Sequence, residues 1–214
     1  MPMNTDLLTL TQWLSPSFPV GAFAYSHGLE QVIDRGDIHN AETLAQWLRD
    51  LLEHGSTRSD ITLLAAAFNA EGSEIDDIDQ TARAFASSAE RVVETVDQGT
   101  AFARTVDEVW GTKMGPLTYP VAAGRAARLK RLPLDMTTEI YLHAFIANLV
   151  SAAVRLVPLG QTDGQRVLSE LAPLILATAE AARDCPLSSL SSACFAADIA
   201  AMHHETQYSK VFRT

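Results

Sequence analysis

The chain has 214 residues, of which 47% are hydrophobic and 20% are charged. A chain of this length buries enough apolar surface for one stable core and is short for two, so we expect a single domain spanning residues 1–214. Its 26 acidic residues outnumber 16 basic ones, which gives a formal net charge of -10. Because an acidic surface repels phosphate backbones and anionic lipids, this balance disfavours binding to nucleic acid or to a membrane surface.

Cysteine content and the first residues bear on the cellular compartment. Cys185 and Cys194 are too few for a disulfide framework, which favours a reducing environment. Residues 1–14 contain no Lys or Arg and include Asp6, unlike a signal peptide. No segment reaches about 18 uninterrupted apolar residues, as a membrane-spanning helix requires. We therefore expect a soluble, cytoplasmic protein.

Apolar residues recur at helical spacing along most of the chain. The clearest helix begins at Asn40 and stops near Gly55, with an apolar stripe that includes Leu44, Leu48 and Leu51. In chain order, the predicted helices span residues 26–35, 40–55, 59–70, 77–98, 101–110, 120–132, 138–157, 163–183 and 189–204. Hairpin signals between alternating β-branched runs are absent. The sequence thus predicts an all-α bundle of roughly eight to ten helices.

Three segments carry more specific expectations. Residues 71–79 are acidic and polar, which favours an exposed connection over a metal site. Pro173 lacks an amide hydrogen, so the helix containing it is expected to kink or restart there. The alanine-rich helix at 189–204 is expected in the centre of the bundle, because small side chains allow close packing.

Motifs for catalysis are missing from the sequence. There is no Gly-x4-Gly-Lys-Ser/Thr phosphate loop, no Gly-x-Ser-x-Gly nucleophile elbow and no Cys-x-x-Cys pair. We expect a protein that is not an enzyme and holds no cofactor.

Two internal clusters permit a structural and a functional interpretation each. Asn148 lies on an apolar helical stripe with Arg155 nearby, which favours a hydrogen-bond network between helices over a ligand contact. The basic cluster at 124–131 is typical of a helix end that compensates its dipole, and a docking patch for an acidic partner is the alternative. His203 and His204 diverge by about 100° on a helix, so one buried and one solvated ring is preferred to a shared metal ion.

Both ends of the chain are unusually apolar. Residues 15–30 combine two prolines with several aromatic residues, so another part of the fold or a partner should cover them. Residues 205–214 keep aromatic side chains almost to the end, whereas a frayed terminus is usually small and polar. This tail either packs on its own bundle or orders against a partner.

Four ordered blocks of the chain resemble the UreF family of urease accessory proteins. They are Ser15-Pro16 with Phe18-Pro19-Val20-Gly21 and Ser26-x-Gly28-Leu29-Glu30; Tyr119-Pro120-Val121; the stretch from Ala153 to Arg166; and His204-Glu205-x-Gln207-Tyr208-Ser209. The resemblance implies an all-α homodimer without catalytic activity. It also implies three partners: a second accessory protein (UreD, also called UreH), the GTPase UreG, and apo-urease, which receives nickel.

This resemblance assigns roles to two sets of residues. A partner-binding surface, including a tail at about 205–214, would use Phe23, Tyr25, Tyr208, Lys210, Phe212 and Arg213. A structural set comprises Pro19, Gly21, Gly28, Glu30, Asn148, Arg155, Gly160, Gln161, Asp163 and Gly164. Many relatives carry Tyr at the position of Phe23 and Arg at that of Lys210, so contacts there should differ.

Two other functions remain as alternatives. A nickel-binding carrier would use His203 and His204, with Glu205 nearby. A small helical hydrolase is the enzymatic alternative, although no constellation of residues supports it.

Overall fold

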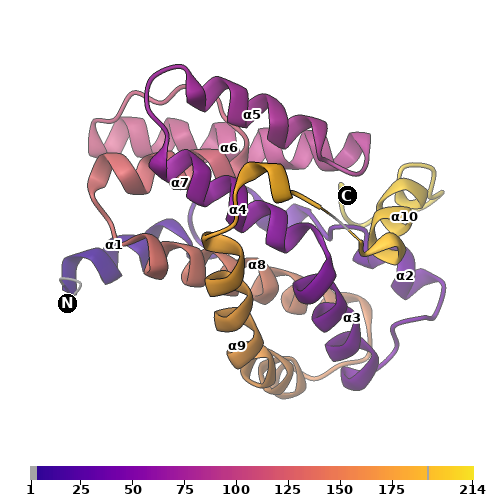
Figure 1. Ribbon diagram of the computed structural model, residues 1–214. Coiled ribbons are helices and arrows are strands. Elements are labelled where there is room, and N and C mark those ends of the chain that lie inside the picture. The colour runs from indigo at the N-terminus through magenta and orange to yellow at the C-terminus, as the bar shows by residue number, and fades with distance from the viewer. Residues whose placement is uncertain (1–3, 192) are drawn as a thin grey trace.

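Figure 1 shows a computed structural model of the protein, in which residues 4–191 and 193–214 are described. Over these ranges the chain forms ten α-helices and two 3-10 turns and contains no strand, which confirms the all-α prediction. The elements are α1 (Asn4–Trp13), η1 (Ala22–Ala24), α2 (Leu29–Asp34), α3 (Ala41–His54), α4 (Ser56–Asn69), α5 (Glu74–Ala84), α6 (Ala89–Trp110), α7 (Tyr119–Lys130), α8 (Leu134–Leu156), α9 (Gln161–Arg183), η2 (Leu187–Ser189) and α10 (Phe195–His204).

Helix α3 forms where its sequence signals place it. The Asn40 side chain accepts a hydrogen bond from the backbone N–H of Thr43 at 2.9 Å, and the Thr43 hydroxyl accepts one from the backbone N–H of Asn40 at 3.2 Å. This reciprocal capping box satisfies two amides that have no partner within the helix. Gly55 ends the helix as expected.

The region from residue 71 to 110 is divided differently from the prediction. Helix α5 already begins at Glu74, and the break falls at Ser88, whose hydroxyl accepts from the backbone N–H of Arg91 and caps α6. The expected break near residue 99 is wrong, because α6 runs through Gly99. A Cβ at this glycine would lie 2.1 Å from the Leu117 carbonyl oxygen, so Gly99 permits close helix packing.

Three further expectations are corrected. Helix α1 was not predicted, and it buries Leu10 and Trp13. Of the two outcomes expected at Pro173, the restart is excluded, because α9 runs continuously through this residue. The predicted helix at 189–204 begins only at Phe195, and Ser192 lies outside the described residues, as do residues 1–3.

Helix α10 lies at the edge of the fold, which contradicts the expected central position. Its buried alanines contact α2, while three large apolar side chains on another face are exposed. Helix α4 has the more central place, since it packs against α7, α9, α5, α3 and α8. The fully buried side chains of Leu48, Leu64, Phe102, Leu142 and Ile146 belong to one continuous core cluster. Each such burial contributes roughly 1.5–3 kcal/mol.

Helix α8 is, among the described residues, the one helix long and apolar enough to cross a membrane. It packs against α9, α2, α4 and α7, and its Leu142 and Ile146 are fully buried. The helix is therefore partly buried core of a soluble fold.

The two chain ends are separated in this arrangement. In Figure 1, α1 lies at one end of the molecule, while α2, α10 and the last residues lie together at the other. Helix α6 also contacts α10, so segments distant in sequence converge there.

Candidate functional site

The tail, residues 205–214, packs onto the opening segment, residues 15–30. The Thr214 carbonyl oxygen accepts hydrogen bonds from the backbone N–H of Ser26 at 2.9 Å and from the Ser26 hydroxyl at 2.5 Å. The Arg213 N–H donates to the Ala24 carbonyl at 2.8 Å. Of the two arrangements left open for the tail, the structure therefore has the one packed on its own chain.

The opening segment adopts an unusual backbone conformation at this contact. His27 and Gly28 have φ angles of 57° and 77°, in the left-handed region that disfavours side chains. A Cβ at Gly28 would lie 2.8 Å from the backbone nitrogen of Ala201. Glycine is required at position 28 both for its conformation and for the close approach of α10.

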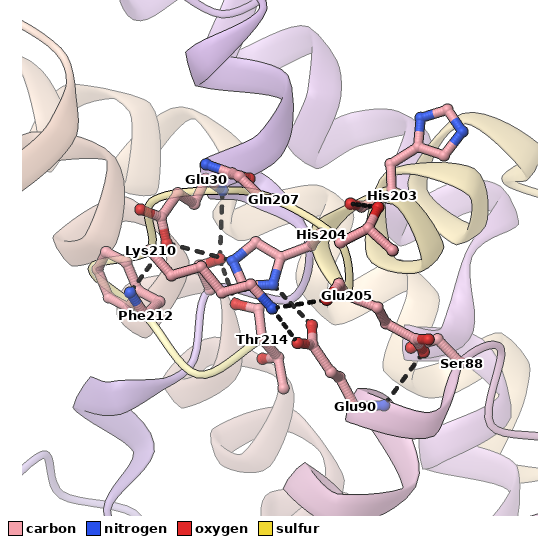
Figure 2. Close-up of polar contacts among 12 residues, drawn as sticks. Glu30, Ser88, Glu90, His203, His204, Glu205, Gln207, Lys210, Phe212 and Thr214 are labelled. Carbon is pink, nitrogen blue, oxygen red and sulfur yellow. Dashed lines mark hydrogen bonds and ion pairs between the residues drawn. The ribbon is translucent and has the colours of Figure 1, made fainter.

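Four ionisable side chains, which we call the carboxylate clasp, hold the tail: Glu30 of α2, Glu90 of α6, His204 of α10 and Lys210 (Figure 2). His204 is fully buried, and its ring nitrogens lie 2.6 Å from Glu90 and 3.2 Å from Glu30. The Lys210 ammonium donates to Glu90 at 2.6 Å. Because carboxylate oxygens accept, a ring nitrogen of His204 that carries a hydrogen donates to the glutamate beside it.

Glu30 also binds the backbone of the tail. Its two carboxylate oxygens accept the N–H groups of Val211 at 2.7 Å and Phe212 at 2.8 Å. Charge-assisted bonds of this kind are stronger than those between neutral groups. The Glu30 side chain is thus the point where α2, α10 and the tail meet.

A second contact of the tail lies at the start of α6. A carboxylate oxygen of Glu205 accepts the Ala89 N–H at 2.7 Å, and Lys210 donates to the Glu205 carbonyl at 3.1 Å. An anion next to the first turn of a helix is favoured by the exposed amides and the helix dipole. The tail therefore bends around the N-terminus of α6.

Helix α8 also contacts the opening segment and the tail. Asn148 donates to the carbonyls of Ala22 at 3.0 Å and Tyr25 at 3.3 Å. Arg155 donates to the Phe23 carbonyl at 3.0 Å and places its guanidinium 4.5 Å from the centre of the Phe212 ring. The structural interpretation of this helix stripe is the one that the geometry favours.

A buried polar layer lies beneath Thr214. The Thr214 hydroxyl donates to Glu94 at 2.7 Å, and Glu94 forms an ion pair with Arg91. Burial alone would raise the pKa of Glu94, but the Arg91 guanidinium and His27 bring this pKa below its ordinary value. Burial and the nearby Arg91 charge lower the pKa of His27.

Two further groups near this layer have raised pKa values. Burial and the Asp97 carboxylate raise the pKa of Tyr25 to about 12, and its hydroxyl donates to Asp97 at 3.2 Å while accepting from Arg213. Burial raises the pKa of Asp60 to about 6, with Arg91 opposing the effect.

The expected partner-binding residues fall into two groups. Tyr25 and Phe212 are each only 3% exposed, so their rings support the docked tail and do not face a partner in the isolated chain. Lys210 and Arg213 are engaged with Glu90 and with Asp97 and Tyr25, respectively. The opening segment, the tail and α10 also carry large exposed apolar side chains: Phe23, Tyr208, Val211, Phe195, Ile199 and Met202.

The two adjacent histidines do not form a joint site. Figure 2 shows the His204 ring directed into the clasp and the His203 ring directed away from it. His203 is exposed, whereas His204 is buried. Within the described part of the chain, no group of three or more His, Cys, Asp or Glu side chains is arranged to hold a metal ion.

The remaining structural set lies in turns and helix contacts. Pro19 is exposed, and Gly21 precedes η1 with φ 72°. Gly160 and Gln161 start α9, Asp163 pairs with Arg166, and Gly164 packs on Val150 and Val154 of α8.

The basic cluster includes contacts at helix ends. Arg125 donates to the Ala70 carbonyl after α4, and Lys130 donates to the Trp110 carbonyl at the end of α6. These contacts favour dipole compensation.

Sequence reasoning missed Glu90, Arg91 and Glu94 as parts of the site. Glu90 and Lys210 are 120 residues apart, so no local pattern joins them. The one available signal was the apolar tail itself, which required a covering surface.

Comparison with known proteins identifies the chain. The UreF family model matches residues 38–172. A urease accessory protein UreF of Roseobacter denitrificans is 66% identical over 213 residues, which cover 99% of this chain and 96% of the relative. The UreF protein of Ruegeria pomeroyi is 50% identical, covering 100% and 99%, and that of Ruegeria sp. (strain TM1040) is 53% identical, covering 97% of each.

The chain belongs to the UreF family. The resemblance seen in the sequence motifs is thereby confirmed, and the chain is a non-catalytic urease accessory protein. The family model ends before α10 and the tail, whereas the similarity to the Ruegeria pomeroyi UreF covers the whole chain.

Proposed function

We propose that this UreF-family chain is a cytoplasmic adaptor for urease maturation. It joins the second accessory protein, UreD or UreH, and recruits or regulates the GTPase UreG, so that nickel reaches apo-urease. Family membership supports a place in this machinery. The observation that carries the adaptor role is the surface formed by the docked tail and α10.

The side chains that form this surface are apolar, yet they are exposed and are not part of the core. Phe195, Ile199 and Met202 recur at i, i+4 and i+7 and form an exposed stripe on α10. Tyr208 and Val211 of the tail are also exposed. Exposed apolar and aromatic side chains gathered in this way are typical of protein–protein interfaces. The clasp presents the tail already ordered, which lowers the entropy cost of binding.

A groove beside the opening segment supports the proposed homodimer. Leu7 and Leu8 of α1 are exposed, and a groove of about 440 Å³ lies between the opening segment and α8. Phe23 and Phe145 are among the residues that line it. A second copy of the chain would cover this groove together with Phe23.

The test is co-purification of the chain with the second accessory protein and the GTPase. Deletion of residues 209–214 is expected to abolish capture of the GTPase while the helical content and the dimer persist. Tyr208→Ala and Met202→Ala, which alter only exposed side chains, are expected to weaken capture without a change in melting temperature.

A matched control is Val109→Ala, an exposed apolar residue on α6 away from the tail. This control should leave capture unchanged. Capture that is equal in wild type, deletion and surface variants would refute a role of the tail surface. GTP hydrolysis by the purified chain alone should not exceed background.

A further inference from the structure

The backbone of the tail approaches Glu30 in a particular way. Two successive N–H groups, of Val211 and Phe212, point to the two oxygens of one carboxylate, at 2.7 Å and 2.8 Å. In an extended strand, successive N–H groups point in opposite directions, so the chain must bend here, as it does at both residues. Consecutive amides that converge in this way form a cradle for an anion.

This bend fixes which side chains face outward. Val211 is 73% exposed, whereas Phe212 is 3% exposed and lies beneath the Arg155 guanidinium. A shift of the tail by one residue would exchange these positions and bring the aromatic ring to the surface. The pair of bonds to Glu30 therefore fixes the bend of the tail at these two residues, and burial of the Phe212 ring fixes which of them faces inward.

Other contacts of the tail lie on either side of this bend: Lys210 precedes it, and the backbone bonds of Arg213 to Ala24 and of Thr214 to Ser26 follow it. Lys210 reaches Glu90 through a long flexible side chain, which tolerates displacement of the backbone. Glu30 is only 5% exposed, and it is also held by His204 at 3.2 Å. The Glu30 carboxylate is thus held by a residue outside the tail as well.

We propose that Glu30 is the positioning residue that fixes the bend of the tail at Val211 and Phe212 and thereby the face that the tail presents to its partner. The inference about the bend rests on these contacts alone, whereas its consequence for recruitment rests on the proposed function. Glutamine at position 30 keeps the size of the side chain but replaces one acceptor by an NH2 donor. That donor would face an N–H group and leave it without a partner.

The test is hydrogen exchange of the Val211 and Phe212 amides in the full-length chain, together with capture of the GTPase. Glu30→Gln is expected to accelerate exchange at both amides at least about tenfold, because bonds to a charged acceptor are lost. Glu90→Gln removes the negative charge beside Lys210 and His204 but leaves the cradle, so both amides should stay protected. Glu108→Gln is a charge-matched control, since Glu108 is exposed on α6.

The outcomes separate the two proposals. Unchanged exchange in Glu30→Gln would overturn the assignment of Glu30. Accelerated exchange with undiminished capture of the GTPase would support Glu30 as the residue that holds the bend and contradict the tail's part in the proposed function.

A second variant, placed in the tail, keeps the test decisive if Glu30→Gln does not fold. Val211→Pro deletes one of the two donors at an exposed position and leaves α2 intact. It should accelerate exchange at Phe212 while the core amides keep their protection, and continued protection of Phe212 would also overturn the assignment.

Discussion

Replacement of Phe212 by alanine tests how strongly the tail is held. The ring is 3% exposed and stacks with the Arg155 guanidinium at 4.5 Å. Loss of a buried phenylalanine typically costs about 3–5 kcal/mol, which exceeds the roughly 1 kcal/mol of an ordinary hydrogen bond. The tail lies at an edge of the fold, so we expect this loss to weaken local docking and leave most of the global stability unchanged.

The assay combines limited proteolysis and hydrogen exchange of the tail with thermal unfolding. Phe212→Ala should accelerate exchange at the amides of Ser26 and Arg213, which the docked tail protects, and should shift the melting temperature little. Val211→Ala is the control, because this neighbouring side chain is 73% exposed. A large fall in melting temperature without preferential exchange in the tail would refute local docking, because the tail would then unfold only with the core.

Three other predictions concern the surroundings of the tail. Gly28→Ala should lower the free energy of unfolding in urea by more than Gly36→Ala does. Both glycines have positive φ, but an added Cβ would meet a neighbouring atom only at Gly28. Equal losses would contradict the close contact with α10. The raised pKa of Asp60 makes its ionisation costly in the folded state, so the wild type should lose stability as the pH rises from about 4 to 6. Asp60→Asn does not ionise, and its free energy of unfolding should therefore rise relative to that of the wild type by up to roughly 3 kcal/mol over this range. A pH-independent difference in urea unfolding would exclude that cause. Asn148→Ala should cost about 1–3 kcal/mol in urea unfolding, because the carbonyls of Ala22 and Tyr25 lose their donor, and a change below 0.5 kcal/mol would show that these bonds contribute little.

Much of the fold was predictable, because helices depend on short-range signals. Asn40 and Gly55 mark the two ends of α3 in the sequence, and both ends occur there. The sequence is helical in pattern on both sides of Ser88, so the helix boundary at this serine was missed and was placed at Gly99 instead. A glycine within a helix indicates a break or a close contact equally well, and only the position of Leu117 decides between them.

The site was less predictable, because it is built from long-range contacts. The motifs drew attention to Glu30, His204 and Lys210. Glu90, which contacts both His204 and Lys210, lies in the middle of the chain and far from both in sequence, so no local pattern joins it to them. The sequence also did not reveal that Phe212 is buried while Val211 is exposed, since that alternation depends on the bend held by Glu30.

The most direct test of the account is activation of apo-urease in a reconstituted mixture of nickel, GTP, the GTPase, the second accessory protein and this chain. We predict full activation with the wild-type chain, little without it, and a large loss with Tyr208→Ala or with residues 209–214 removed, while Val109→Ala remains active. Equal activation in the presence and absence of the chain, or undiminished activation by the truncated chain, would contradict the claim that its tail surface assembles the maturation complex.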